Sequence, residues 1–77
     1  MSIRDIIDAR GLLCPLPVLR LRKALLDLAP GQQVTLLATD AMAMVDVPHF
    51  CEQAGHAMIE AHVIDDGVHE FVVVKGT

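Results

Sequence analysis

The chain has 77 residues, enough for one domain (residues 1–77) and too few for two separately packed cores. Hydrophobic residues make up 53% of the sequence and aromatic residues only 3%, so we expect an aliphatic core and exclude an intrinsically disordered chain. The net charge of −4 argues against direct binding of nucleic acid, which normally requires a basic surface. Charged residues near the N-terminus and the lack of an apolar run of about 18 residues predict a cytoplasmic location, with no secretory signal and no membrane span.

The charges are distributed unevenly along the chain. Residues 10–29 contain four basic side chains and one acidic one, whereas residues 30–77 contain one lysine and seven acidic side chains. The basic segment includes Cys14. It predicts either a basic surface near this cysteine or an ordinary solvated helix face.

The first predicted element is a strand over residues 3–9, rich in isoleucine and followed by Gly11. A helix is predicted from Pro15 onward, because apolar residues then recur with helical spacing opposite a charged face. Pro30 and Gly31 end this helix. Its apolar face is expected to consist of Val18, Leu21, Leu25 and Leu28.

A buried second strand is predicted over residues 33–39, closed by Asp40, which is itself expected to be a cap. Asp46 is expected to be the N-cap of a second helix, with Pro48 in its first turn, where the missing N–H of proline has no helical acceptor. Gly55 follows the end of this helix as its expected C′ residue.

Two further strands are predicted over residues 57–64 and 68–75, joined by the hairpin sequence Asp65-Asp66-Gly67. The order βαβαββ predicts an α/β (α+β) two-layer sandwich, in which two helices cover one face of a four-stranded mixed sheet. Residues 71–74 are apolar on both strand faces, so we expect the last strand to lie inside the sheet. The other sheet face would carry no helices. We expect a monomer, with self-association through that face as the alternative.

Cys14 is the residue best suited to carry chemistry. It is expected at the N-cap or N1 position of the first helix, where Pro15 and Pro17 would stiffen the turn that presents the sulfur. The helix dipole and free backbone N–H groups favour a thiolate there, and Arg10 in the preceding loop could add to this effect. We therefore predict a pKa below that of a free cysteine. The alternative is that Cys14 is a small buried hydrophobic residue.

The segment Asp8-Ala9-Arg10-Gly11-Leu12, followed by Cys14-Pro15-x-Pro17, resembles the signature of the TusA/SirA-like sulfur carriers. The resemblance covers nearly the whole chain. It continues through Pro30-Gly31, Ala38-Thr39-Asp40, Asp46-Val47-Pro48-x-Phe50-Cys51 and Ala54-Gly55-His56, to Lys75-Gly76.

The resemblance implies a βαβαββ sandwich with the sheet order 1-2-4-3. It also implies that Cys14 carries sulfur as a persulfide. The sulfur would come from a protein donor, such as a cysteine desulfurase or a rhodanese, and pass to an acceptor such as a DsrE-like protein or a thiolation enzyme. Such a protein relays sulfur rather than turning over a small substrate, and it needs no cofactor or metal. Family members serve 2-thiouridine synthesis on tRNA, dissimilatory sulfur oxidation, or the handling of thiosulfate or selenium, and the sequence does not choose between these pathways.

The chain departs from the family pattern on both sides of the cysteine. Leu13 and Leu16 stand where many members carry polar or charged residues, which makes the surroundings of the sulfur more apolar. We expect partners to dock on Leu13 and Leu16 beside the sulfur, and on Arg20 and Lys23 along the solvent face of the helix.

Alternative functions involve the second cysteine and the histidines. Cys51 is expected to be a buried structural thiol, and the alternative is a resolving cysteine in a Cys14/Cys51 thiol–disulfide redox protein. A non-enzymatic interaction or regulatory module of the same fold is a further alternative. The spacing of the four histidines relative to the two cysteines matches no common metal site.

Overall fold

The structure, a computed structural model, describes residues 5–76. Six elements follow one another in the predicted order βαβαββ. They are β1 (Asp5–Ala9), α1 (Leu16–Leu26), β2 (Gln33–Ala38), α2 (Ala43–Ala54), β3 (Ala57–Asp65) and β4 (Val68–Val74). The predicted first strand is confirmed from Asp5 onward, and its residues 3 and 4 lie outside the described part of the chain.

The four strands form one mixed sheet in the order β1-β2-β4-β3, as the resemblance implied. β1 and β2 run parallel, and both pairs that involve β4 are antiparallel. β4 therefore lies inside the sheet, as its apolar sequence predicted, and β3 forms an edge. The β3 strand contains two irregularities in its pairing with β4, and most of its residues are exposed.

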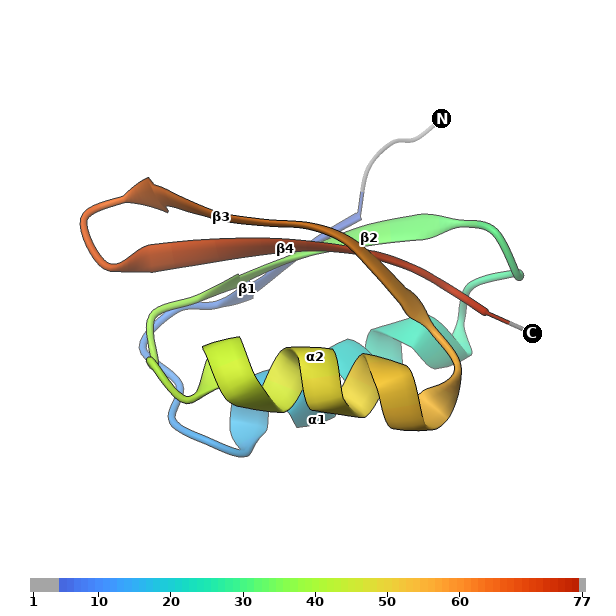
Figure 1. Ribbon diagram of the computed structural model, residues 1–77, viewed down its shortest axis with the longest axis horizontal. Coiled ribbons are helices and arrows are strands. Elements are labelled where there is room, and N and C mark those ends of the chain that lie inside the picture. The colour runs from blue at the N-terminus through green and yellow to red at the C-terminus, as the bar shows by residue number, and fades with distance from the viewer. Residues whose placement is uncertain (1–4, 77) are drawn as a thin grey trace.

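Both helices cover the same face of the sheet, as predicted from the preference for right-handed β-α-β connections, and they lie side by side (Figure 1). The two-layer sandwich predicted from the element order is confirmed. The helices begin at the same end of the molecule, where the β1–α1 and β2–α2 loops also lie (Figure 1). This end therefore gathers residues that are far apart in the sequence.

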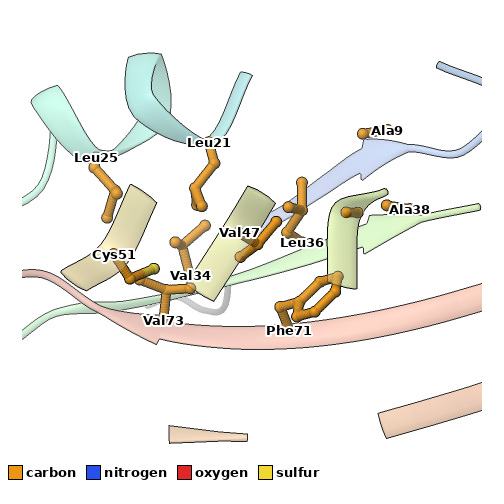
Figure 2. Close-up of a cluster of buried hydrophobic side chains, with 11 residues drawn as sticks. Ala9, Leu21, Leu25, Val34, Leu36, Ala38, Val47, Cys51, Phe71 and Val73 are labelled. Atoms are coloured by element: carbon orange, nitrogen blue, oxygen red, sulfur yellow. The ribbon is translucent and has the colours of Figure 1, made fainter. Parts of the chain in front are cut away.

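The core lies between the helices and the sheet and is aliphatic apart from one phenylalanine and one cysteine. Leu21 and Leu25 of α1 pack toward strand residues, and Cys51 of α2 points into the same cluster (Figure 2). The predicted apolar face of α1 is confirmed for Val18, Leu21 and Leu25, of which Val18 is half-buried. The helix ends at Leu26, before the predicted stop at Pro30, so the half-buried Leu28 lies in the segment that follows it. The buried hydrophobic residues of the core are Ala9, Leu21, Leu25, Val34, Leu36, Ala38, Ala43, Val47, Cys51, Phe71 and Val73, and Pro17 in the first turn of α1 is buried as well.

The second helix begins earlier than the sequence predicted. Its N-cap is Met42 rather than Asp46, and Asp46 lies within the helix at the end of its first turn. The reason is a turn at Asp40, whose carbonyl oxygen accepts the Ala43 N–H and whose carboxylate accepts the Met42 N–H. Pro48 consequently lies beyond the first turn, where its ring removes the N–H that would bond to the carbonyl of Met44.

Candidate functional site

The candidate site lies at the end of the sheet where the parallel strands β1 and β2 finish. In open α/β sheets, functional sites commonly form beyond the carboxyl ends of such strands. Here the loop after β1 is joined to the segment after β2 by two hydrogen bonds. Gly11 donates its N–H to Oγ1 of Thr39 at 2.8 Å, and Cys14 donates its N–H to Oδ2 of Asp40 at 2.6 Å. The backbone of Cys14 is thus fixed by contacts that its own segment does not supply.

Cys14 lies one position before the N-cap of the first helix, whereas the sequence predicted it at the N-cap or N1 position. The N-cap of α1 is Pro15, and its carbonyl accepts the first helical hydrogen bond, from Leu19 at 3.1 Å. A turn comes immediately before it, closed by a bond of 2.8 Å from the Leu16 N–H to the Leu13 carbonyl. The expectation that Cys14 occupies N-cap or N1 was therefore wrong, and the residue lies just outside the helix. It is exposed to solvent and free.

Few helical N–H groups remain to stabilise a thiolate at Cys14. Pro15 and Pro17 have none, and the Leu16 N–H is already donated to Leu13. The prolines that stiffen this turn thereby remove the donors on which the prediction of a lowered pKa depended.

The strongest contact of the Cys14 sulfur is with a carboxylate. Sγ of Cys14 donates a hydrogen bond to Oδ2 of Asp46 at 2.7 Å. This bond is the largest cause of a raised pKa at Cys14, followed by partial removal of the sulfur from water and by the negative charges of Asp46 and Asp40. The predicted lowering of this pKa was wrong: the charged groups that act on the sulfur, Asp46 and Asp40, are negative and favour the protonated thiol.

Asp40 holds the shape of the site. One carboxylate oxygen accepts the Cys14 N–H and the other accepts the Met42 N–H at 3.0 Å. These backbone hydrogen bonds, first that of Cys14 and then that of Met42, lower the pKa of Asp40, so the carboxylate is ionised at neutral pH. The sequence suggested a cap at Asp40 but not that one side chain would join two loops.

Arg10 is paired with Asp8, not with the cysteine. Its Nε and Nη2 donate to the two carboxylate oxygens of Asp8 at 2.8 and 2.9 Å. The side-chain hydrogen bond to Arg10 is the main reason that the pKa of Asp8 falls to about 2. Among the described residues, the charged groups that shift the pKa of Cys14 are both acidic, so Arg10 does not provide the expected support for a thiolate.

Besides the two carboxylates, the segments that form the site carry exposed apolar side chains. Leu13 is 70% exposed and Leu16 is 46% exposed, and Met42 on the neighbouring loop is 48% exposed. Arg20 and Lys23 lie farther along α1, and both are exposed. The expected docking residues are therefore accessible, and they combine an apolar part near Cys14 with a basic part along the helix.

The remaining sequence candidates lie away from this end or inside the core. Cys51 is 2% exposed on the inner face of α2, as expected for a structural thiol, and burial raises its pKa. Within residues 5–76, the structure brings no three histidine, cysteine or acidic side chains together as a metal site. Neither described helix has the length and apolar character needed to cross a membrane.

Residues 5–75 match the family described as Sulfurtransferase TusA. The chain belongs to the TusA family of sulfur carriers. It is 44% identical over 59 residues to the sulfur carrier protein TusA of Pseudomonas aeruginosa, an alignment that covers 77% of this chain and 75% of that one. A Neisseria meningitidis protein is 45% identical over 69 residues, which is 90% of this chain and 92% of the other.

A solved structure supports the same assignment. The SirA-like protein of Desulfitobacterium hafniense has a TM-score of 0.84 and 34% sequence identity, and the match covers 97% of this chain and all of that one. Membership of the TusA family confirms the resemblance on which the sulfur-carrier interpretation was built. It also implies protein partners for sulfur transfer.

Sequence reasoning missed the role of Asp46. Its position before a proline in an apparent helix start suggested a cap, and nothing in the linear pattern joins it to a cysteine 32 residues away. The only sequence signal is that Asp46 and Cys14 both fall in segments that resemble the TusA family.

Proposed function

We propose that this TusA-family protein carries sulfur as a persulfide on Cys14 and relays it between two proteins. The observation that supports the proposal most is an exposed, free cysteine on a loop held in place by Asp40, at the end of the sheet. A carrier must present its sulfur to two different partners, and a fixed, accessible thiol on a small domain meets that requirement.

The proposed chemistry is thiol exchange at a sulfane sulfur. The Cys14 thiol gives up its proton to solvent, and the thiolate attacks the outer sulfur of a persulfide on the donor. One S–S bond forms at Cys14 while the S–S bond of the donor breaks, and the donor cysteine leaves as a thiolate. No electron is gained from outside the two proteins. Delivery repeats the same step, with Cys14 as the leaving thiolate.

We propose a cysteine desulfurase or a rhodanese as the donor, and a DsrE-like protein or a thiolation enzyme as the acceptor. Either partner would contact Leu13 and Leu16 next to the sulfur and Arg20 and Lys23 along α1, as a monomeric carrier docking transiently. The exposure of these four side chains supports this surface.

Intact-mass spectrometry tests the function directly. The purified protein is incubated with a cysteine desulfurase and cysteine, without reductant, and we expect a gain equal to the mass of one sulfur atom. Cys14→Ser is expected to lose this gain and to keep its fold, whereas Cys51→Ala should still accept sulfur. A Cys14→Ser protein that still gains sulfur would show that the proposed mechanism is wrong. Loss of two hydrogens without gained sulfur would indicate the Cys14/Cys51 disulfide instead.

A further inference from the structure

The contact between Cys14 and Asp46 is unusual for a residue that must become a nucleophile. The attacking species in sulfur exchange is the thiolate, and positive charge beside a cysteine favours that form. This protein instead places the Asp46 carboxylate 2.7 Å from the sulfur and uses it as a hydrogen-bond acceptor for the thiol.

The surroundings of Cys14 reinforce the effect of Asp46. The Asp40 carboxylate binds the backbone N–H of the same residue, and its negative charge also disfavours a thiolate. The nearest basic side chain in the same loop, Arg10, is held by Asp8 through two hydrogen bonds. Three segments therefore place charged groups at this end of the molecule. The loop before α1 contributes Arg10, which is paired with Asp8 of β1, the β2–α2 loop contributes Asp40, and the first turn of α2 contributes Asp46.

We infer that Asp46 keeps Cys14 as a neutral thiol in the free, unloaded carrier, so that the sulfur reacts slowly with small electrophiles and oxidants. Asp46 can do this because it lies on α2, which packs against the sheet and is a different segment from the loop that carries Cys14. Its own N–H is bonded to the Met42 carbonyl at 2.8 Å, which fixes the position of the residue at the start of α2.

This inference rests on the proposed function, because Asp46 protects the atom that the proposal assigns to sulfur transfer. It adds a role that sulfur transfer alone does not require. A carrier that meets many thiol-reactive small molecules between two partners benefits from a sulfur that is accessible but protonated. The hydrogen bond supplies this without burying the cysteine.

The test measures the rate at which iodoacetamide alkylates Cys14 as a function of pH, with mass spectrometry to assign the modified residue. In the wild-type protein we expect the midpoint of this rate–pH profile to lie above about 8.5, the pKa of a free cysteine. In Asp46→Asn the amide keeps the size of the side chain and removes its charge, so the midpoint should fall.

The expected change in rate can be calculated from the shift in pKa. Each unit by which the pKa falls gives about ten times more thiolate at neutral pH, and the lower basicity of that thiolate removes about threefold of the gain. A fall of one unit therefore gives about threefold faster alkylation at neutral pH.

Asp27→Asn provides the matched control. Asp27 is the exposed C-cap of α1, at the end of the helix away from Cys14, and the variant makes the same change in net charge. Its alkylation profile should match that of the wild type. Thermal unfolding of all three proteins checks that each remains folded at the temperature of the assay.

Three results would overturn the inference. The first is a wild-type midpoint at or below that of a free cysteine. This measurement does not need the variant, so it tests the inference even if Asp46→Asn fails to fold. The second is an unchanged profile in a folded Asp46→Asn protein, and the third is an equal shift in Asp27→Asn. The alkylation assay uses no sulfur donor, so failure of the proposed function appears separately, as a wild-type protein that gains no sulfur from the desulfurase.

Discussion

At the scale of single residues, the properties of Cys14 come from side chains outside its own sequence motif. The motif supplies two prolines and a turn, while Asp40 and Asp46 supply the contacts to the backbone and to the sulfur. The sequence pattern and the family resemblance both made Cys14 the candidate, but the argument from its expected place at the helix start predicted the wrong direction for its pKa. That direction depends on which charged group is nearest in space, and a linear pattern does not contain this information.

The raised pKa of Cys14 predicts how stability changes with pH. The folded protein holds the thiol proton more tightly than the unfolded chain, so this stabilisation is complete below the unfolded pKa, about 8.5. It is lost as the pH rises through the folded pKa. Serine does not ionise in this range, so any excess stability of the wild type over Cys14→Ser should shrink above that pH. Thermal unfolding of both proteins across the alkaline range measures this, and a difference that grows with pH would contradict the assignment.

Cys51 is predicted to act through packing alone. Its side chain lies in the core between α2 and the sheet, and Cys51→Ala removes one buried sulfur atom (Figure 2). We expect a loss of about 1–2 kcal/mol in the free energy of unfolding, the lower end of the range for shortened core residues. Denaturant unfolding measures the loss, and the desulfurase assay should show unchanged sulfur acceptance. A stable Cys51→Ala protein with impaired sulfur acceptance would instead support a resolving role.

At the scale of elements, most of the fold follows from the sequence because each element has a local cause. Helical spacing predicted α1, the Asp-Asp-Gly turn predicted the β3–β4 hairpin, and a glycine with a φ of 82° ends α2 as expected. The start of α2 was predicted wrongly, since two polar residues, Asp40 and Asp46, both had the character of a cap. The side chain of Asp40 forms the turn, and it also reaches across to the Cys14 backbone, which no local rule predicts.

The chain after β4 is predicted to need glycine at position 76. The Gly76 N–H is donated to Nδ1 of His56 at 3.0 Å, and a Cβ at position 76 would overlap the carbonyl group of Gly55. Gly76→Ala should therefore push this segment away from the end of α2 and reduce stability by about 1–3 kcal/mol, as overpacking usually does. Gly67→Ala is a useful comparison, because its Cβ would meet open space and only the backbone φ of 74° would be strained. Equal stability of Gly76→Ala and the wild type would mean that this contact does not hold in solution.

At the scale of the whole molecule, the hydrophobic core and the candidate site lie in different places. The core lies between the sheet and the inner faces of the helices, while Cys14 and its two carboxylates lie in and beside the loops at one end. The hydrophobic pattern could predict the first part, because it depends on burial. It could not predict the second, because the contacts that define the site join residues 26 and 32 positions apart and depend on how the two loops meet.

The charge distribution predicts how partners approach the sulfur. Arg20 and Lys23 are exposed on α1, in the basic segment of an otherwise acidic chain, so we expect an acidic surface on the partners to meet them. Exposed charges act mainly on the rate of association, and salt screens them within about 8–10 Å. Arg20→Glu combined with Lys23→Glu should slow persulfide transfer from the desulfurase several-fold and weaken or reverse its normal slowing by salt.

The neutral pair Arg20→Gln and Lys23→Gln should give a smaller change in the same direction. Both variants should keep the wild-type rate of Cys14 alkylation and the wild-type unfolding temperature, because neither residue contacts the sulfur or the core. Transfer rates and salt dependence equal to those of the wild type would show that this helix face is only solvated surface, and that the partners dock through other residues.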